Sequence, residues 1–71
     1  MLKFDDEIEF ILGRPNFWCG PVARRLREQG HNIKEKSEVE QAHVLYWMMS
    51  LYEQHGKEWA KKFNEFISKA D

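Results

Sequence analysis

The sequence predicts an all-α protein, a compact four-helix domain with a central hydrophobic third helix. Apolar residues recur at helical spacing through most of the chain, and no stretch alternates apolar and polar residues as a half-buried strand does. Glycine and proline residues divide the chain into four such stretches. In the third stretch, residues 44–52 (VLYWMMSLY) are almost all apolar or aromatic. A helix that is apolar on every side must be covered by other elements.

The first predicted helix runs from Asp5 to Leu12. Its acidic first turn suits the positive end of the helix dipole, and Gly13 and Pro15 end it. The segment that follows, RPNFWCGP, is expected to be an ordered loop or broken turn, in which Asn16 caps a short turn.

Pro21 suits the first position of a helix, so a second helix, PVARRLREQ, is expected to begin there and to end at Gly30. Its apolar side chains are expected to face inward, and its charged ones to face water: Arg24, Arg25, Arg27 and Glu28. The polar connector HNIKEK contains one apolar residue, Ile33, which we expect to lie under the domain.

The third and longest helix is predicted to run from Ser37 to His55, because Ser37 and Glu40 have the spacing of a capping box. Gly56 interrupts the helical pattern, and a fourth helix is expected to lie antiparallel to the third. This fourth helix is amphipathic, with an apolar stripe that consists of Trp59, Phe63, Phe66, Ile67 and Ala70.

The composition indicates a single folded domain over residues 1–71. A chain of 71 residues is near the lower limit for one self-sufficient core, and a hydrophobic content of 42% is too high for a disordered segment. The single cysteine, Cys19, excludes an intramolecular disulfide and a four-cysteine zinc site. The N-terminus is acidic and no 18-residue apolar run occurs, so we expect a cytoplasmic protein without membrane contact.

Two groups of residues have the types needed for chemistry. Glu40 and His43 form a Glu-x-x-His pair, but a di-iron site needs a second pair and two further carboxylates, which only a symmetric dimer would approach. Cys19 with a histidine (His31, His43 or His55) lacks an orienting third group and a cleft. We therefore expect no enzyme activity, no catalytic or metal-binding residues, no cofactor and no small-molecule substrate.

A basic segment from Arg24 to Lys36 supplies an alternative function, that of a small nucleic-acid-associated regulator. Its candidate contacts are Arg24, Arg25, Arg27 and Lys34, and two helices around Gly30 would suit a helix-turn-helix. The glutamates of KEKSEVEQ would repel phosphates, and a net charge of −1 argues against nonspecific binding. A solvated helix face is the simpler interpretation of these charges.

The aromatic residues supply the leading hypothesis, a small noncatalytic protein-interaction module. Three short helices are expected to leave part of the third helix uncovered, and uncovered Trp, Tyr and Met residues are typical of interfaces. The candidate protein-binding residues are Phe17, Trp18, Tyr46 and Trp47. The partner is expected to be a larger protein or a second copy, as a two-fold homodimer through Tyr46 and Trp47. In the opposing interpretation, all of these side chains are buried in the monomer.

The runs FILGRPNFWCGPVARRLREQG and EQAHVLYWMMSLYEQHG resemble short all-α open reading frames of unassigned function from temperate phages and prophages. The resemblance covers most of the chain. It implies a small accessory protein of a phage that acts on a phage or host component rather than on a metabolite. It transfers no catalytic or binding residues to this chain.

Overall fold

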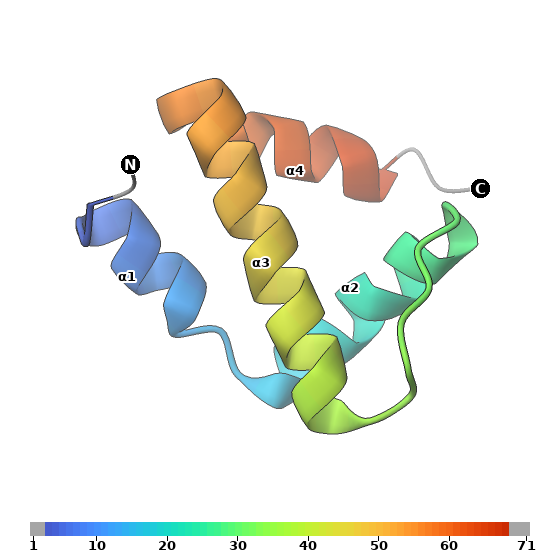
Figure 1. Cartoon of the computed structure of the whole chain (residues 1–71). Helices are drawn as coiled ribbons and strands as arrows, with labels where there is room; N and C mark the ends of the chain where they lie inside the picture. The colour runs from blue at the N-terminus through green and yellow to red at the C-terminus, as the bar shows by residue number, and fades with distance from the viewer. Residues whose placement is uncertain (1–2, 69–71) are drawn as a thin grey trace.

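The computed structural model describes residues 3–68, and every regular element among them is helical (Figure 1). The elements are α1 (Asp6–Leu12), α2 (Asn16–Glu28), α3 (Ser37–His55), the 3-10 turn η1 (Gly56–Glu58) and α4 (Trp59–Ser68). This confirms the all-α prediction. Because α3, η1 and α4 follow one another without a loop, they also count as one bent helical segment, which gives three helical units instead of four separate ones. No helix among the described residues is long and apolar enough to cross a membrane.

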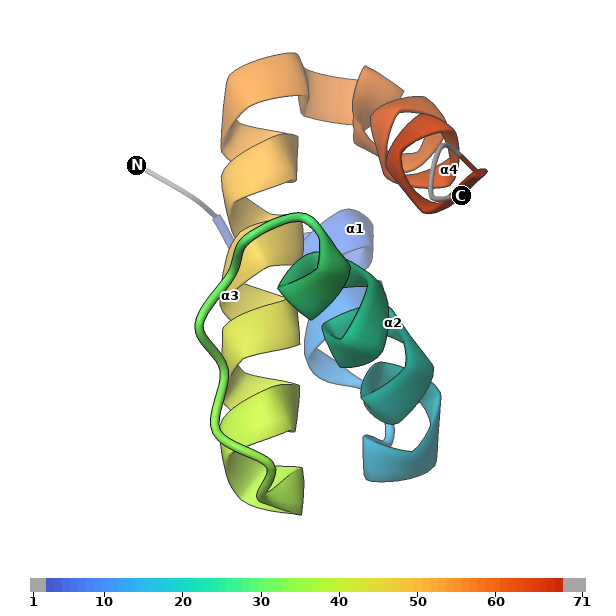
Figure 2. The ribbon, with the colours of Figure 1, turned by 90° about the vertical axis from the view of Figure 1, so that its right-hand side faces the viewer.

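The α3 helix lies in the middle of the arrangement and packs against α1, α2 and α4 (Figures 1 and 2). Its residues Val44 and Met48, one turn apart, are fully buried. The radius of gyration is 11.8 Å, close to the roughly 11 Å expected for a compact domain of this length. The core around α3 draws on all the other helices and consists of Ile8, Ile11, Cys19, Val22, Ala23, Leu26, Ile33, Val44, Met48 and Trp59.

The α2 helix begins five residues earlier than the sequence predicts. The segment expected to be a loop or broken turn is helical from Asn16 onward, and Pro21 lies inside the helix rather than at its start. The N-cap is Pro15, without a side-chain hydrogen bond, so the prediction that Asn16 caps a turn is wrong. An internal proline costs about 3 kcal/mol. Burial of Cys19, Val22, Ala23 and Leu26 on one face of the helix offsets this cost.

The α3 helix has the predicted bounds, but the predicted capping box does not form. Its N-cap is Lys36, which makes no side-chain hydrogen bond, and the Glu40 carboxylate instead binds Arg27 on α2. The connector before α3 is anchored by Ile33, which is buried as predicted.

The bend between α3 and α4 occurs at Gly56, whose φ of 60° lies in the left-handed region that favours glycine. After this bend, α4 runs obliquely back across α3 and does not lie antiparallel along it (Figure 1). The apolar stripe predicted for α4 packs against the core through Trp59, Phe63, Phe66 and Ile67. Ala70, the last predicted member of the stripe, lies outside the described residues.

Candidate protein-binding groove

The helices α2 and α4 both pack against α3 (Figure 2). Their side chains enclose an apolar groove between the two helices. Its outer part is lined by Phe17, Trp18, Pro21 and Val22 of α2 and by Phe63 and Ile67 of α4. We call this the α2–α4 groove. Phe17, at its edge, is 83% exposed although it is a large apolar side chain in a helix.

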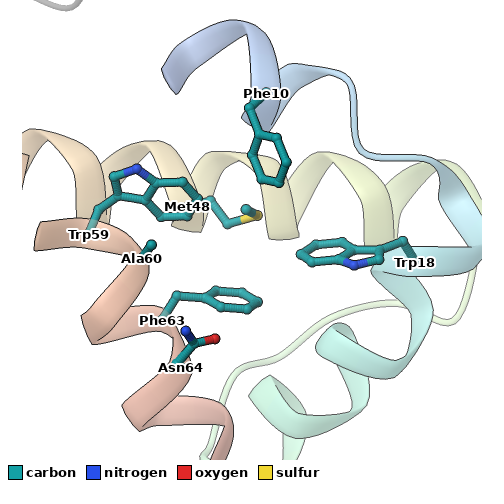
Figure 3. Close-up of a pocket in the computed structure, with 7 residues that line it drawn as sticks. All are labelled: Phe10, Trp18, Met48, Trp59, Ala60, Phe63 and Asn64. Carbon is teal, nitrogen blue, oxygen red and sulfur yellow. The ribbon is translucent and has the colours of Figure 1, made fainter. Parts of the chain in front are cut away.

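The inner part of the groove reaches down to α1 and α3 (Figure 3). It is lined by Phe10, Trp18, Met48, Trp59, Ala60, Phe63 and Asn64. Trp18 and Phe63 line both parts, so the two hollows adjoin each other on either side of this ring pair. Their rings stack at a centroid distance of 5.6 Å and an interplanar angle of 14°, which joins the two walls at this point.

The structure separates the four aromatic residues predicted to bind protein. Phe17 and Trp18 line the groove. Trp47 instead packs against the rings of Phe63 and Phe66, at centroid distances of 5.5 and 4.8 Å, where it supports α4. Tyr46 is 71% exposed on α3 and is not among the groove residues. Trp47 is therefore engaged within the chain and is poorly placed for the predicted dimer contact.

Sequence reasoning missed Phe10, Pro21, Phe63 and Ile67 as groove residues. The signal for Phe63 and Ile67 was present, because they belong to the predicted stripe of α4, but a stripe alone does not show that its edge stays uncovered. The sequence predicts a helix start at Pro21. In the structure, Pro21 is exposed inside α2 and lines the α2 side of the groove.

The rims of the groove are basic. The Arg14 guanidinium lies 3.8 Å from the ring centroid of Phe10 and 5.7 Å from that of Trp18, so a positive charge stands beside the inner part. Along α2, Arg24 and Arg25 line the outer surface next to Pro21, together with Glu28, which pairs with Arg25 at 3.3 Å.

The α4 rim adds further positive charge. Lys57 and Lys61 are exposed and lie three residues before Ala60 and Asn64, which places each pair side by side on the helical surface. The groove is thus apolar inside, and basic side chains outnumber acidic ones at its edges although the whole chain has a net charge of −1. The inner part also has an acidic neighbour, because Glu7 Oε2 accepts a hydrogen bond from Trp59 Nε1.

Arg27 faces water only in part, because its side chain is 25% exposed and its guanidinium is engaged within the chain. Its Nη2 donates to Glu40 Oε2 at 2.7 Å, and its guanidinium also donates to the carbonyls of Ile33 at 2.9 Å and Lys34 at 3.0 Å. Arg27 therefore ties α2, the connector and α3 together. The four residues of the nucleic-acid alternative do not share one face. Arg24 and Arg25 line the outer surface of α2, whereas Arg27 turns toward α3 and Lys34 is exposed in the connector.

The histidines predicted as partners of Cys19 or Glu40 are arranged differently. His31 and His43 contact each other, with 3.2 Å between His31 Nδ1 and His43 Nε2. Burial, and secondarily the charge of His31, lowers the pKa of His43 below its usual value. Glu40 pairs with Arg27 instead. Among residues 3–68, no three or more His, Cys, Asp or Glu side chains are grouped as metal ligands.

Cys19 is fully buried in the core, and burial raises the pKa of its thiol, an effect that the positive charge of Arg14 partly opposes. A buried thiol with a raised pKa is a poor nucleophile. These surroundings resemble those of a packing residue.

No family model, curated protein or solved structure matches this chain.

Proposed function

We propose that this protein is a small noncatalytic protein-interaction module, and that its α2–α4 groove binds an amphipathic helix of a larger protein partner. The observation that carries the proposal is the pair of adjoining apolar hollows between α2 and α4, with Phe17 exposed at the edge of the outer one. An amphipathic helix that lays its apolar face into such a groove is a recurring mode of recognition.

The energetic argument rests on the side chains of the groove. The free chain leaves three apolar side chains partly exposed, namely Phe17, Trp18 and Ile67. Each Å² of their surface that a partner buried would contribute about 25 cal/mol to binding. Aromatic residues that are half-buried in a pocket are the types that dominate binding energy when a partner completes their burial. The aromatic side chains of the groove are also held in place before binding, because Phe63 stacks on Trp18 and packs against Trp47.

The charges select the kind of helix. Arg14, Arg24 and the lysines Lys57 and Lys61 surround the apolar floor, so we propose that the partner helix is acidic along its flanks. Such charges speed association and suppress wrong partners more than they add affinity. The resemblance to phage reading frames supports an accessory protein that acts in the cytoplasm on a phage or host protein.

The nucleic-acid alternative has weaker support. Arg24 is exposed to solvent, but Arg25 pairs with Glu28, and Arg27 is held by Glu40 and two carbonyls. The predicted basic segment is therefore divided. An apolar floor between the rims suits a helix better than a phosphate backbone.

The test uses two synthetic helical peptides with the same apolar face and with either acidic or basic flanks. NMR of the three tryptophan indole N–H groups follows binding, because Trp18 lines the groove. We expect the acidic peptide to shift the Trp18 signal. Phe17→Ser should weaken its affinity by about tenfold or more, as for loss of an aromatic anchor, and added salt should weaken it further.

Tyr46→Ser is the matched control, because it removes an exposed aromatic residue that lies outside the groove. Equal effects of Phe17→Ser and Tyr46→Ser, equal binding of the basic peptide, or no binding of either peptide would contradict the proposal. A short DNA duplex that binds more tightly than the acidic peptide would favour the nucleic-acid alternative. Sedimentation equilibrium that shows a dimer abolished by Phe17→Ser would identify a second copy as the occupant.

A further inference from the structure

His31 and His43 meet edge to face where the connector crosses α3. The centroids of the two rings are 5.4 Å apart, and the ring planes make an angle of 81°. The facing nitrogens, His31 Nδ1 and His43 Nε2, are 3.2 Å apart. Both side chains are half-buried, so the pair borders solvent rather than lying in the core.

The backbone on both sides of the pair is well anchored. His43 belongs to the long helix α3, and the His31 backbone N–H donates to the Leu26 carbonyl at 3.0 Å at the end of α2. Beyond His31, Arg27 binds the carbonyls of Ile33 and Lys34, and it also binds Glu40, one turn before His43 on α3. The two backbone segments that carry the imidazoles are therefore held together by contacts that do not depend on the pair itself.

The separation of the two nitrogens fits a shared metal ion. Metal–imidazole bonds are about 2.0–2.1 Å long. With the two nitrogens 3.2 Å apart, bonds of that length enclose an angle of about 100° at the metal, between the cis angle of a square-planar site and the tetrahedral angle. We propose that His31 Nδ1 and His43 Nε2 bind one divalent late transition-metal ion, of the Zn²⁺ and Cu²⁺ class, that joins the connector to α3.

Binding requires both facing nitrogens to be unprotonated. In the neutral pair, one of the two nitrogens carries the hydrogen of the direct contact. A shift of that histidine to its other tautomer frees both lone pairs, and both rings must then turn so that the lone pairs point at the metal ion and not at each other. Both rings stay neutral, so the exchange releases no net proton.

The donor set determines which ions bind. Imidazole nitrogen suits Zn²⁺, Cu²⁺ and Ni²⁺ and does not suit Mg²⁺ or Ca²⁺, which prefer oxygen. The nearby carboxylate of Glu40 is engaged by Arg27, so water is left to complete the coordination. This inference is independent of the α2–α4 groove, which contains neither histidine.

The test is titration of the untagged protein with Cu²⁺, Zn²⁺ and Mg²⁺, followed by calorimetry and, for Cu²⁺, by nitrogen hyperfine splitting in electron paramagnetic resonance. We expect Cu²⁺ to bind most tightly, with two nitrogens coordinated, and Mg²⁺ not to bind. His31→Gln and His43→Gln should each weaken Cu²⁺ binding on the order of 10²-fold, since two linked ligands bind far more tightly than one.

His55→Gln is the matched control, because His55 is the remaining histidine and lies at the far end of α3. Equal weakening by His55→Gln, or coordination by a single nitrogen, would overturn the proposal. Circular dichroism establishes that each variant is folded. If one is not, NMR of the wild-type histidine rings decides: Zn²⁺ should perturb His31 and His43 and leave His55 unchanged, and uniform perturbation would overturn the site.

Discussion

The Tyr52 hydroxyl on α3 donates a hydrogen bond to Asp5 Oδ2 at 2.5 Å, across 47 positions of the chain. The other oxygen of the same carboxylate, Oδ1, accepts the Ile8 backbone N–H at 2.9 Å and so caps α1. One carboxylate thus begins α1 and attaches it to α3. The bond from Tyr52, and secondarily that from Ile8, lowers the pKa of Asp5, and donation to Asp5 raises the pKa of Tyr52.

Because the pKa of Asp5 in the folded protein lies below its usual value of 3.8, its contribution to stability is present above that value. The contribution is lost as the pH falls through the lowered pKa. We expect the stability of Tyr52→Phe to fall less steeply with decreasing pH, because the substitution removes the hydrogen bond that contributes most to the lowered pKa of Asp5. Thermal unfolding between about pH 5 and pH 2 measures the effect. Tyr46→Phe, whose hydroxyl is exposed, serves as the control, and an identical acid profile for wild type and Tyr52→Phe would contradict the prediction.

Phe63 contacts the rings of Trp18, Trp47 and Trp59. We expect Phe63→Ala to cost about 3 kcal/mol of unfolding free energy, at the low end of the range for phenylalanine because the side chain is only half-buried. Urea denaturation measures the loss. A loss below about 1 kcal/mol, typical of a surface site, would show that α4 contributes little to the core.

Arg27 and Arg24 allow a comparison on one helix. Arg27→Met leaves Glu40 and two connector carbonyls without their donor, and we expect a loss of about 1–3 kcal/mol. Arg24→Met removes an exposed charge and should change the unfolding free energy by less than about 0.5 kcal/mol. Denaturation of the two variants under one buffer is the measurement. Equal effects would mean that the Arg27 contacts add nothing.

The Cys19 thiol should react slowly in the folded protein, since it is fully buried and burial raises its pKa. Labelling with a thiol reagent should proceed at the rate at which the protein opens. The urea-unfolded chain is the reference, and labelling of the native protein at the same rate would contradict this prediction.

The helical class follows from local periodicity, the end of α3 from Gly56, and the burial of Ile33 from its place as the one apolar residue of a polar connector. The predicted start of α3 at Ser37 is also correct, although the capping box that predicted it does not form. The start of α2 does not follow from the sequence. Gly20 and Pro21 are local signals for a break, and burial of Cys19 and Val22 on the same face of α2 outweighs them. Ser37 and Glu40 likewise have capping-box spacing, but Glu40 has a stronger, charged partner in Arg27, which lies far away in the sequence.

The sequence predicts no groove. It marks Phe17, Trp18 and Trp47 only as aromatic residues that the core leaves over, and periodicity does not show which side of α3 receives α4. The oblique path of α4 decides which of them are covered. It covers Trp47 and leaves the wall of α2 open.

The bend at Gly56 allows α4 to separate locally from the rest of the fold. The backbone of α4 lies closest to α3 and η1. It is joined to α1 and α2 through side chains, chiefly those of Trp59 and Phe63. Local contacts re-form quickly after a chance separation, so α4 can lift and return without unfolding the rest. Amide hydrogens of α4 should therefore exchange with deuterium before those of α2 and the middle of α3. The helix α4, which forms one wall of the groove, is thus also the helix that separates with the smallest free-energy cost. A partner bound in the groove should therefore slow the hydrogen exchange of the α4 amides.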